Sequence, residues 1–122
     1  MTSALIDNSE VGDWCRTSLA SGNVVAPHLM PFEVANIIRR SVLRGAISAA
    51  DGAAAISDLG HLTVEYVSFD LLSESVWRLR DNFTAYDASY VAAAAALACP
   101  LITLDRRLSR APDIPCQVVT PW

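Results

Sequence analysis

Hydrophobic residues recur at helical intervals in several stretches of the sequence. Residues 32–43 carry an apolar stripe and are followed by Gly45, a residue type that commonly ends helices. Ser48 then has the sequence context of an N-cap before an alanine-rich helix. Residues 71–80 carry another apolar stripe, and residues 87–98 are alanine and valine almost all round. Four longer helices are therefore predicted, and the last is expected to be deeply buried.

Short apolar or alternating runs between these helices predict β-strands. Residues 24–26 and 63–67 have the apolar or β-branched content of strands. Residues 100–104 suit an interior parallel strand, and residues 117–119 suit a last edge strand. Strands separated by helices predict a three-layer α/β fold with a mainly parallel sheet. Because no linker or repeat interrupts the pattern, we expect a single domain over residues 1–122.

Composition and charge narrow the classes of function. Hydrophobic residues make up 52% of the 122 residues, which excludes a disordered chain. The net charge of −4 argues against broad electrostatic adhesion to nucleic acid, although a metal ion and a few arginines can still hold a phosphate. All nine basic residues are arginine. P-loop NTPases and receiver-type acidic pockets depend on a lysine, so the sequence argues against both.

The expected cellular location follows from two sequence patterns that are not found, a membrane span and a signal peptide. No apolar run reaches the roughly 18 residues of a membrane span, and the first residues have no signal-peptide pattern. Cys15, Cys99 and Cys116 lack the paired spacing of zinc sites and are interpreted as ordinary small residues. We expect a cytoplasmic protein without membrane contact.

Two aspartates stand where a strand ends or a helix begins. Asp105 follows the run 100–104, where it can bind a metal ion or cap the short helix that follows. Asp87 opens the alanine-rich helix, where it can cap that helix or lie toward the apolar interior. An unpaired carboxylate is costly in such a place, and a bound cation would remove that cost. Each aspartate alone leaves both interpretations open.

A third acid, Glu33, lies near the start of the first predicted helix, where the helix dipole favours any carboxylate. Asn36 lies one turn later and can hydrogen-bond Glu33 or a substrate phosphate. Glu33, Asp87 and Asp105 can converge on one edge of the sheet, and such oxygen ligands select Mg²⁺ or Mn²⁺. These ions bind a scissile phosphate and activate a water molecule.

Three segments together resemble the PIN-domain toxins of the VapC type. Residues 32–36, 84–92 and 101–108 match the family's second, third and fourth signature segments in order and spacing. The resemblance covers nearly the whole chain from about Gly12 onward. It implies a PIN-like three-layer α/β/α fold. It also implies that the metal-site acids are Glu33, Asp87 and Asp105.

The resemblance implies an activity and partners as well. The expected activity is Mg²⁺-dependent endonucleolytic cleavage of RNA, with Mn²⁺ as a substitute ion, by the toxin of a type II toxin–antitoxin pair. A VapB-like antitoxin would cover the acidic pocket, and a homodimer is expected. Nothing in the sequence identifies the RNA target.

The family's first signature segment is a short apolar strand followed by Asp, a small residue and Ser, and it can be placed in two ways. In one, residues 5–9 are that segment and Asp7 is a fourth metal ligand, although fewer residues separate Asp7 from Glu33 than is usual in the family. In the other, which the spacing favours, residues 3–6 belong to the next helix and the first strand lies upstream of Met1. The second placement supports an alternative function, a catalytically impaired, truncated PIN-like module that binds antitoxin or RNA without cleavage.

Further polar residues beside the acids are candidates for contact with the substrate. The hydroxyl residues that flank Asp87 can support a metal-bound water or substrate, or merely cap the alanine-rich helix. Two arginines after the last acid can meet a phosphate or simply face solvent. The candidates are Asn36, Thr84, Ser89, Arg106 and Arg107.

Overall fold

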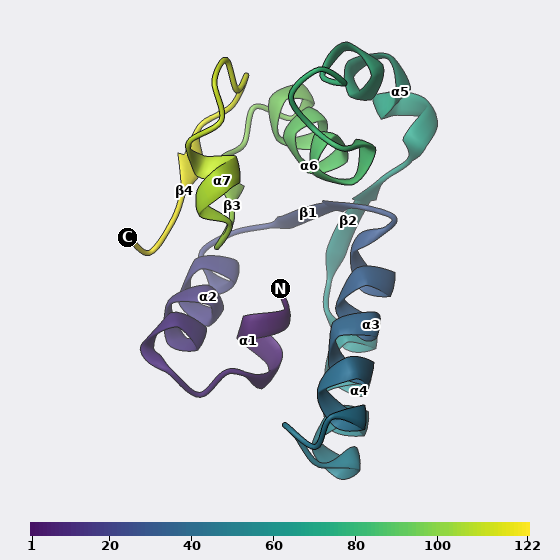
Figure 1. The fold of residues 1–122 in the computed structure, drawn as a ribbon, viewed down its shortest axis with the longest axis vertical. Coiled ribbons are helices and arrows are strands. Elements are labelled where there is room, and N and C mark those ends of the chain that lie inside the picture. Colours follow the sequence, from purple (N-terminus) through teal and green to yellow (C-terminus); the bar gives the residue numbers. More distant parts are fainter. The chain divides into compact units, whose positions relative to one another are not determined.

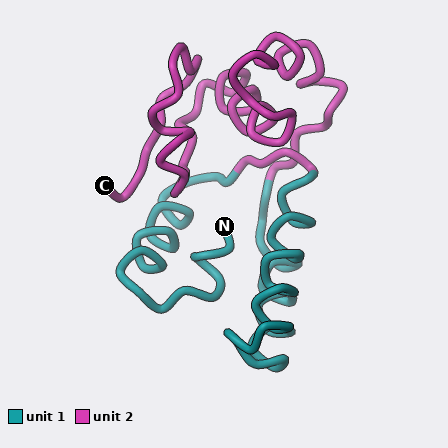
Figure 2. Tube along the Cα trace, in the orientation of Figure 1, with its two compact units in different colours: residues 1–24, 29–64 teal, residues 25–28, 65–122 magenta.

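The computed structural model describes residues 1–122. The chain divides into two compact units, each built from two stretches of sequence (Figure 2). Unit 1 comprises Met1–Val24 and Leu29–Val64, and unit 2 comprises Val25–His28 and Glu65–Trp122. None of the helices combines the length and the apolar composition that crossing a bilayer requires. The single domain expected over the whole chain stays a prediction.

Unit 1 is built from four helices (Figure 1). They are α1 (Thr2–Ile6), α2 (Glu10–Ala20), α3 (Met30–Leu43) and α4 (Ala49–His61). Helix α1 packs against α2, and α3 packs against α4. The helices predicted over residues 32–43 and after Ser48 are confirmed.

The turn between α3 and α4 follows from its sequence. Gly45 has a φ of 77°, a left-handed conformation that residues with a side chain rarely adopt, so α3 ends there. The Ser48 hydroxyl oxygen then accepts a hydrogen bond of 3.0 Å from the backbone N–H of Asp51 and starts α4. The predicted stop and the predicted cap are both confirmed.

The strands and the remaining helices lie in unit 2, apart from the first residue of each of the first two strands. They are β1 (Val24–Pro27), β2 (Val64–Val67), α5 (Phe69–Arg78), α6 (Ala85–Ala96), β3 (Leu101–Ile102), α7 (Arg106–Ser109) and β4 (Val118–Val119). Every element predicted for this part of the chain is present, with small shifts at its ends.

The strands form two pairs, β1 with β2 and β3 with β4. Strands β3 and β4 are parallel, in a register that pairs Leu101 with Val118. The strand predicted over residues 100–104 is shorter than expected. Pro100 has no N–H to donate to a ladder, and Asp105 already begins a helical turn. The short strand nevertheless delivers Asp105 directly to the start of α7.

The core of unit 2 forms around α6. Ala88 and Val91 on this helix are fully buried, with 0% exposure. Helix α5 packs against α6 and contributes Leu72 and Val76 to the same cluster. The deep burial predicted for this alanine-rich helix is confirmed over residues 88–94, whereas residues 95–98 are exposed. A helix buried in this way holds its first turn, which carries Asp87, in a fixed position.

The two placements of the first signature segment require different local structures near the N-terminus, a strand before Asp7 or a helix over residues 3–6. Residues 2–6 form helix α1, and residues 5–9 contain no strand. The apolar strand that the first placement puts before Asp7 is therefore wrong, and the helix that the second placement expects for residues 3–6 is confirmed. The backbone N–H of Asp7 donates to the Ser3 carbonyl at 3.1 Å, which closes α1 as a helical turn rather than leaving an extended strand.

Candidate functional site

Asp87 lies in the first turn of α6, and Thr84 is the N-cap of that helix. The Thr84 hydroxyl oxygen accepts a hydrogen bond of 3.2 Å from the backbone N–H of Asp87. The capping interpretation of Thr84 is thus confirmed, while Asp87 occupies the third helical position and is half-buried. Because the cap holds the Asp87 backbone, Thr84 positions the carboxylate indirectly.

Removing this cap should measurably destabilise the protein. We expect Thr84→Ala to lower the free energy of unfolding by about 1 kcal/mol, because one N–H at the start of α6 loses its acceptor. Urea denaturation followed by circular dichroism measures the change. Thr84→Ser is the matched control, since it keeps the hydroxyl and should retain most of the stability. Equal losses in both variants would contradict the capping role.

Asp105 divides its two carboxylate oxygens between two tasks. Its Oδ1 accepts hydrogen bonds from the backbone N–H groups of Arg107 and Leu108, at 2.8 and 3.4 Å, and so caps α7. Its Oδ2 accepts a hydrogen bond of 3.0 Å from Nη2 of the Arg107 side chain. Capping uses Oδ1, whereas the shortest contact with the guanidinium uses Oδ2, so the capping and cation-binding interpretations of Asp105 are compatible.

The Arg107 guanidinium connects the two aspartates electrostatically. Its hydrogen bond to Asp105 lowers the pKa of that carboxyl group below its ordinary value. In return, the hydrogen bond to Asp105 raises the pKa of Arg107, and the nearby charge of Asp87 adds to the increase. Arg107 thus pairs directly with Asp105, while Asp87 acts on it only through its charge, and the convergence of the two acids on one metal ion stays a prediction.

The carboxylates of Asp105 and Asp87 are of the hard oxygen type that Mg²⁺ and Mn²⁺ prefer, and Asp105 is the one of the two that contacts a cationic side chain. Glu33, the third predicted acid, lies in the first turn of α3 in unit 1, whereas the two aspartates belong to unit 2. Within either unit, no three His, Cys, Asp or Glu side chains gather as a metal site. The complete three-acid site stays a prediction.

Asp7 lies in unit 1, in the turn between α1 and α2. Its Oδ1 accepts a hydrogen bond of 2.8 Å from the Ser9 backbone N–H, and hydrogen bonds from Ser9 lower the pKa of this carboxyl group. Its main-chain carbonyl accepts a hydrogen bond of 2.9 Å from Nη1 of Arg16. These contacts give Asp7 a structural role at the helix end, and its role as a metal ligand stays a prediction.

The other candidates have local partners of their own. The Ser89 hydroxyl donates to the Tyr86 carbonyl at 2.6 Å within α6, and only 7% of this serine is exposed. The Arg106 guanidinium lies 4.4 Å from the centre of the Trp122 ring, an arrangement typical of cation–π contact. Asn36 is exposed on α3. Contact of these residues with a substrate stays a prediction.

Sequence analysis missed the partner of Arg107. It assigned this arginine to a phosphate or to solvent, whereas the structure pairs it with Asp105. Side chains two apart within a helix do not face each other. Asp105 is an N-cap with extended backbone, however, so its side chain folds back over the first turn. An acidic N-cap followed two residues later by arginine is the signal that could have predicted this pair.

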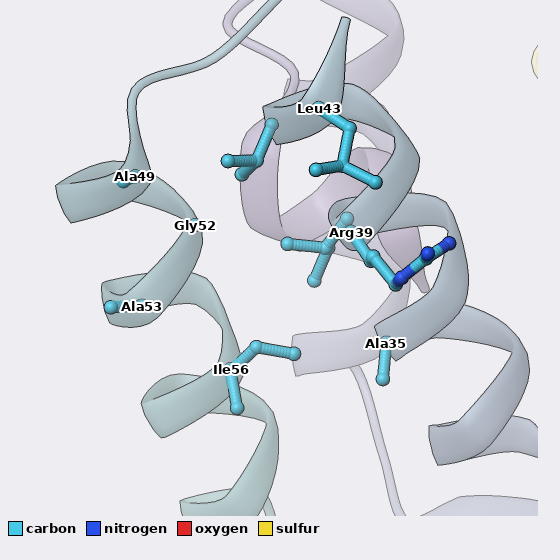
Figure 3. A pocket seen from close by; sticks show the side chains of 9 residues that line it. Ala35, Arg39, Leu43, Ala49, Gly52, Ala53 and Ile56 are labelled. Atoms are coloured by element: carbon cyan, nitrogen blue, oxygen red, sulfur yellow. The ribbon is translucent and has the colours of Figure 1, made fainter.

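A separate groove of about 440 Å³ lies between α3 and α4 in unit 1 (Figure 3). Alanine, leucine, isoleucine and valine side chains line it, with Gly52 and a single charged residue, Arg39. No carboxylate is among the lining residues. The groove is therefore unsuited to a metal ion, and the candidate cation site lies with the aspartates of unit 2.

Known proteins are similar to this sequence over most of its length. Residues 2–114 match the family described as PIN domain. Ribonuclease VapC1 of Mycobacterium tuberculosis (strain ATCC 25618 / H37Rv) is 46% identical over 94 residues, which cover 76% of this chain and 71% of the relative. Ribonuclease VapC9 of the same strain is 40% identical over 103 residues, 84% of this chain and 81% of the relative.

A more distant relative extends the match further along the chain. Ribonuclease VapC3 of M. tuberculosis (strain CDC 1551 / Oshkosh) is 32% identical over 113 residues, which cover 89% of this chain and 82% of the relative. The resemblance stated from the signature segments is confirmed, and with it the PIN-like α/β class of the fold. The chain belongs to the PIN domain family and is a VapC-type member of it.

Proposed function

We propose that this chain is a Mg²⁺-dependent endoribonuclease, with Mn²⁺ as a substitute ion, and the toxin of a type II toxin–antitoxin pair. The relatives are named ribonucleases, which supports RNA as the substrate. The observation that supports the metal site is that Asp87 and Asp105 each lie at the start of a helix of unit 2, with Asp105 in contact with a cationic side chain. Such paired carboxylates are the ligands that a phosphodiester-cleaving metal site needs.

In the proposed mechanism, the residues of this chain hold and orient the reacting groups. Asp87, Asp105 and Glu33 would hold the metal ion, which when bound supplies an activated water and a contact to the scissile phosphate. The backbone N–H groups of α7 hold Oδ1 of Asp105, which leaves Oδ2 with fewer partners and therefore better able to bind a cation. Arg106 would contribute positive charge near the phosphate.

Partners and location belong to the same proposal. A VapB-like antitoxin would neutralise the toxin, since the relatives carry VapC names and the chain shares their family. We also expect a homodimer that acts in the cytoplasm. Size-exclusion chromatography with light scattering measures the oligomeric state of the chain alone and with an antitoxin encoded next to it.

A second candidate function is binding without turnover. The contacts of Asp7 favour it, because this acid lies at a helix end with its side chain held by Ser9 rather than at the end of a strand. A chain with only three of four metal ligands could still bind antitoxin or RNA. The two candidates share partners and differ in whether RNA is cut.

A cleavage assay separates the two candidates. Purified protein is incubated with single-stranded RNA in Mg²⁺, in Mn²⁺ or in EDTA, and the products are resolved on a sequencing gel. The proposed enzyme gives internal cuts with either ion and none in EDTA. Intact RNA in all three conditions, together with retention of RNA or antitoxin by the folded chain, supports binding without turnover. Equal cleavage with and without metal would exclude the metal mechanism.

A further inference from the structure

The side chain of Arg107 forms a two-pronged contact with the carboxylate of Asp105. Its Nη2 donates to Oδ2 at 3.0 Å, and its Nε lies 3.4 Å from Oδ1. The charge of Asp87 is also close enough to act on this guanidinium. A single side chain thus neutralises the carboxylate of one predicted metal ligand, Asp105.

The same arginine is only lightly held. Its side chain is 88% exposed, whereas the side chain of Asp105 is 32% exposed. Exposed ion pairs contribute little free energy and exchange readily with solvent. The fold can therefore release the guanidinium without losing core packing, while the helix cap keeps Oδ1 of Asp105 in place.

We propose that Arg107 is a tethered counter-cation, which holds the Oδ2 atom of Asp105 until a divalent metal ion displaces it. This inference rests on the proposed metal-dependent function and adds to it a positioning residue with a defined effect on metal affinity. A divalent ion that binds Oδ2 competes with the guanidinium for that oxygen, because the two positive charges repel each other at a separation of a few ångströms. Metal binding therefore includes the free energy of breaking the Arg107–Asp105 pair.

Removing the guanidinium should tighten metal binding. We expect Arg107→Gln to lower the Kd for Mn²⁺ by about two- to fivefold, the range that an exposed ion pair corresponds to. Isothermal titration calorimetry on the full chain measures the Kd without any need for cleavage. Because Arg107 is exposed, the variant should retain the fold, and its circular dichroism spectrum checks this.

Arg106→Gln is the matched control, because it removes the same charge from the adjacent residue and leaves the pair with Asp105 intact. A greater gain in affinity for Arg107→Gln than for Arg106→Gln supports the tethered counter-cation. Equal gains, or none for Arg107→Gln, overturn it while metal-dependent function stands. No Mn²⁺ binding in any of the three proteins overturns both proposals.

A second readout follows the arginine itself. Addition of Mg²⁺ to the unchanged protein should shift the Nε–Hε resonance of Arg107 in nitrogen–proton correlation spectra, because its carboxylate partner is taken over. The Nε–Hε resonance of Arg78, paired with Glu74 on α5, serves as the internal reference and should stay in place. Bound Mg²⁺ with an unchanged Arg107 resonance would overturn the displacement.

Discussion

Asp87→Asn should abolish metal-dependent RNA cleavage while leaving the fold of unit 2 intact. Asparagine matches aspartate in shape but has no charge, so the carboxylate beside Arg107 and Asp105 is lost. Changes in residues that only orient metal ligands cost roughly 10- to 100-fold, and loss of a direct ligand should exceed about 100-fold. Initial cleavage rates in Mg²⁺ measure the effect.

The control for this variant is Asp81→Asn. Asp81 is an exposed acid in the same unit, in the turn before α6. Its replacement by asparagine removes the same charge outside the candidate site. It should cleave RNA at nearly the unchanged rate. Asp87→Asn should unfold at a slightly lower urea concentration, because an acid near a helix N-terminus contributes about 0.3–1 kcal/mol. Full activity in Asp87→Asn would remove this acid from the mechanism.

Gly12→Ala should destabilise unit 1 by about 2 kcal/mol, the typical cost of forcing an extra carbon into a packed site. A Cβ on Gly12 would lie 1.9 Å from the carbonyl oxygen of Asp7. The obstacle is backbone, and the same oxygen also accepts a hydrogen bond from Arg16, so α1 would have to move away from α2. Urea denaturation measures the loss.

Gly60→Ala provides the contrast for this substitution. Gly60 lies within α4, and a Cβ there would meet nothing within 4 Å. Because alanine favours a helix over glycine, this variant should be as stable as the unchanged protein or more stable by up to about 1 kcal/mol. If both glycine variants lose stability equally, the close approach between α2 and Asp7 is not the cause.

Local sequence signals were sufficient for the helices because their ends carry specific chemistry. Gly45 and Ser48 mark the stop of α3 and the start of α4 by backbone conformation and capping, and both effects act within a few residues. The burial of α6 was equally clear from its composition, since a helix that is apolar all round must be covered.

The N-terminal segment was ambiguous for a physical reason. Leu5 and Ile6 form a short apolar run before Asp7, and such runs suit a strand or a buried helical turn equally well. The choice depends on packing against α2, where Gly12 permits close approach, and that contact is not visible in the local pattern. The length of β3 was unpredictable for a similar reason, since a strand extends only as far as its partner pairs with it.

The helix starts that carry the candidate acids were predictable from the sequence. Asp87 lies in the first turn of α6 and Asp105 caps α7, while their convergence on one metal ion stays a prediction. Whether Glu33 joins them depends on tertiary contacts between segments far apart in the chain, which residue spacing does not encode. The division of labour between the oxygens of Asp105 was also beyond sequence analysis, because capping and cation binding use the same residue type.

The small side chains of α6 have a consequence for how this protein can change over time. Around fully buried alanines such as Ala88 there is no free volume that a larger side chain could fill. A substitution deep in the helix would tilt or slide it as a whole, and its first turn would carry Asp87 along. Variation that alters the chemistry of the protein can thus arise at positions that never touch a substrate, and the buried positions of α6 should tolerate few replacements.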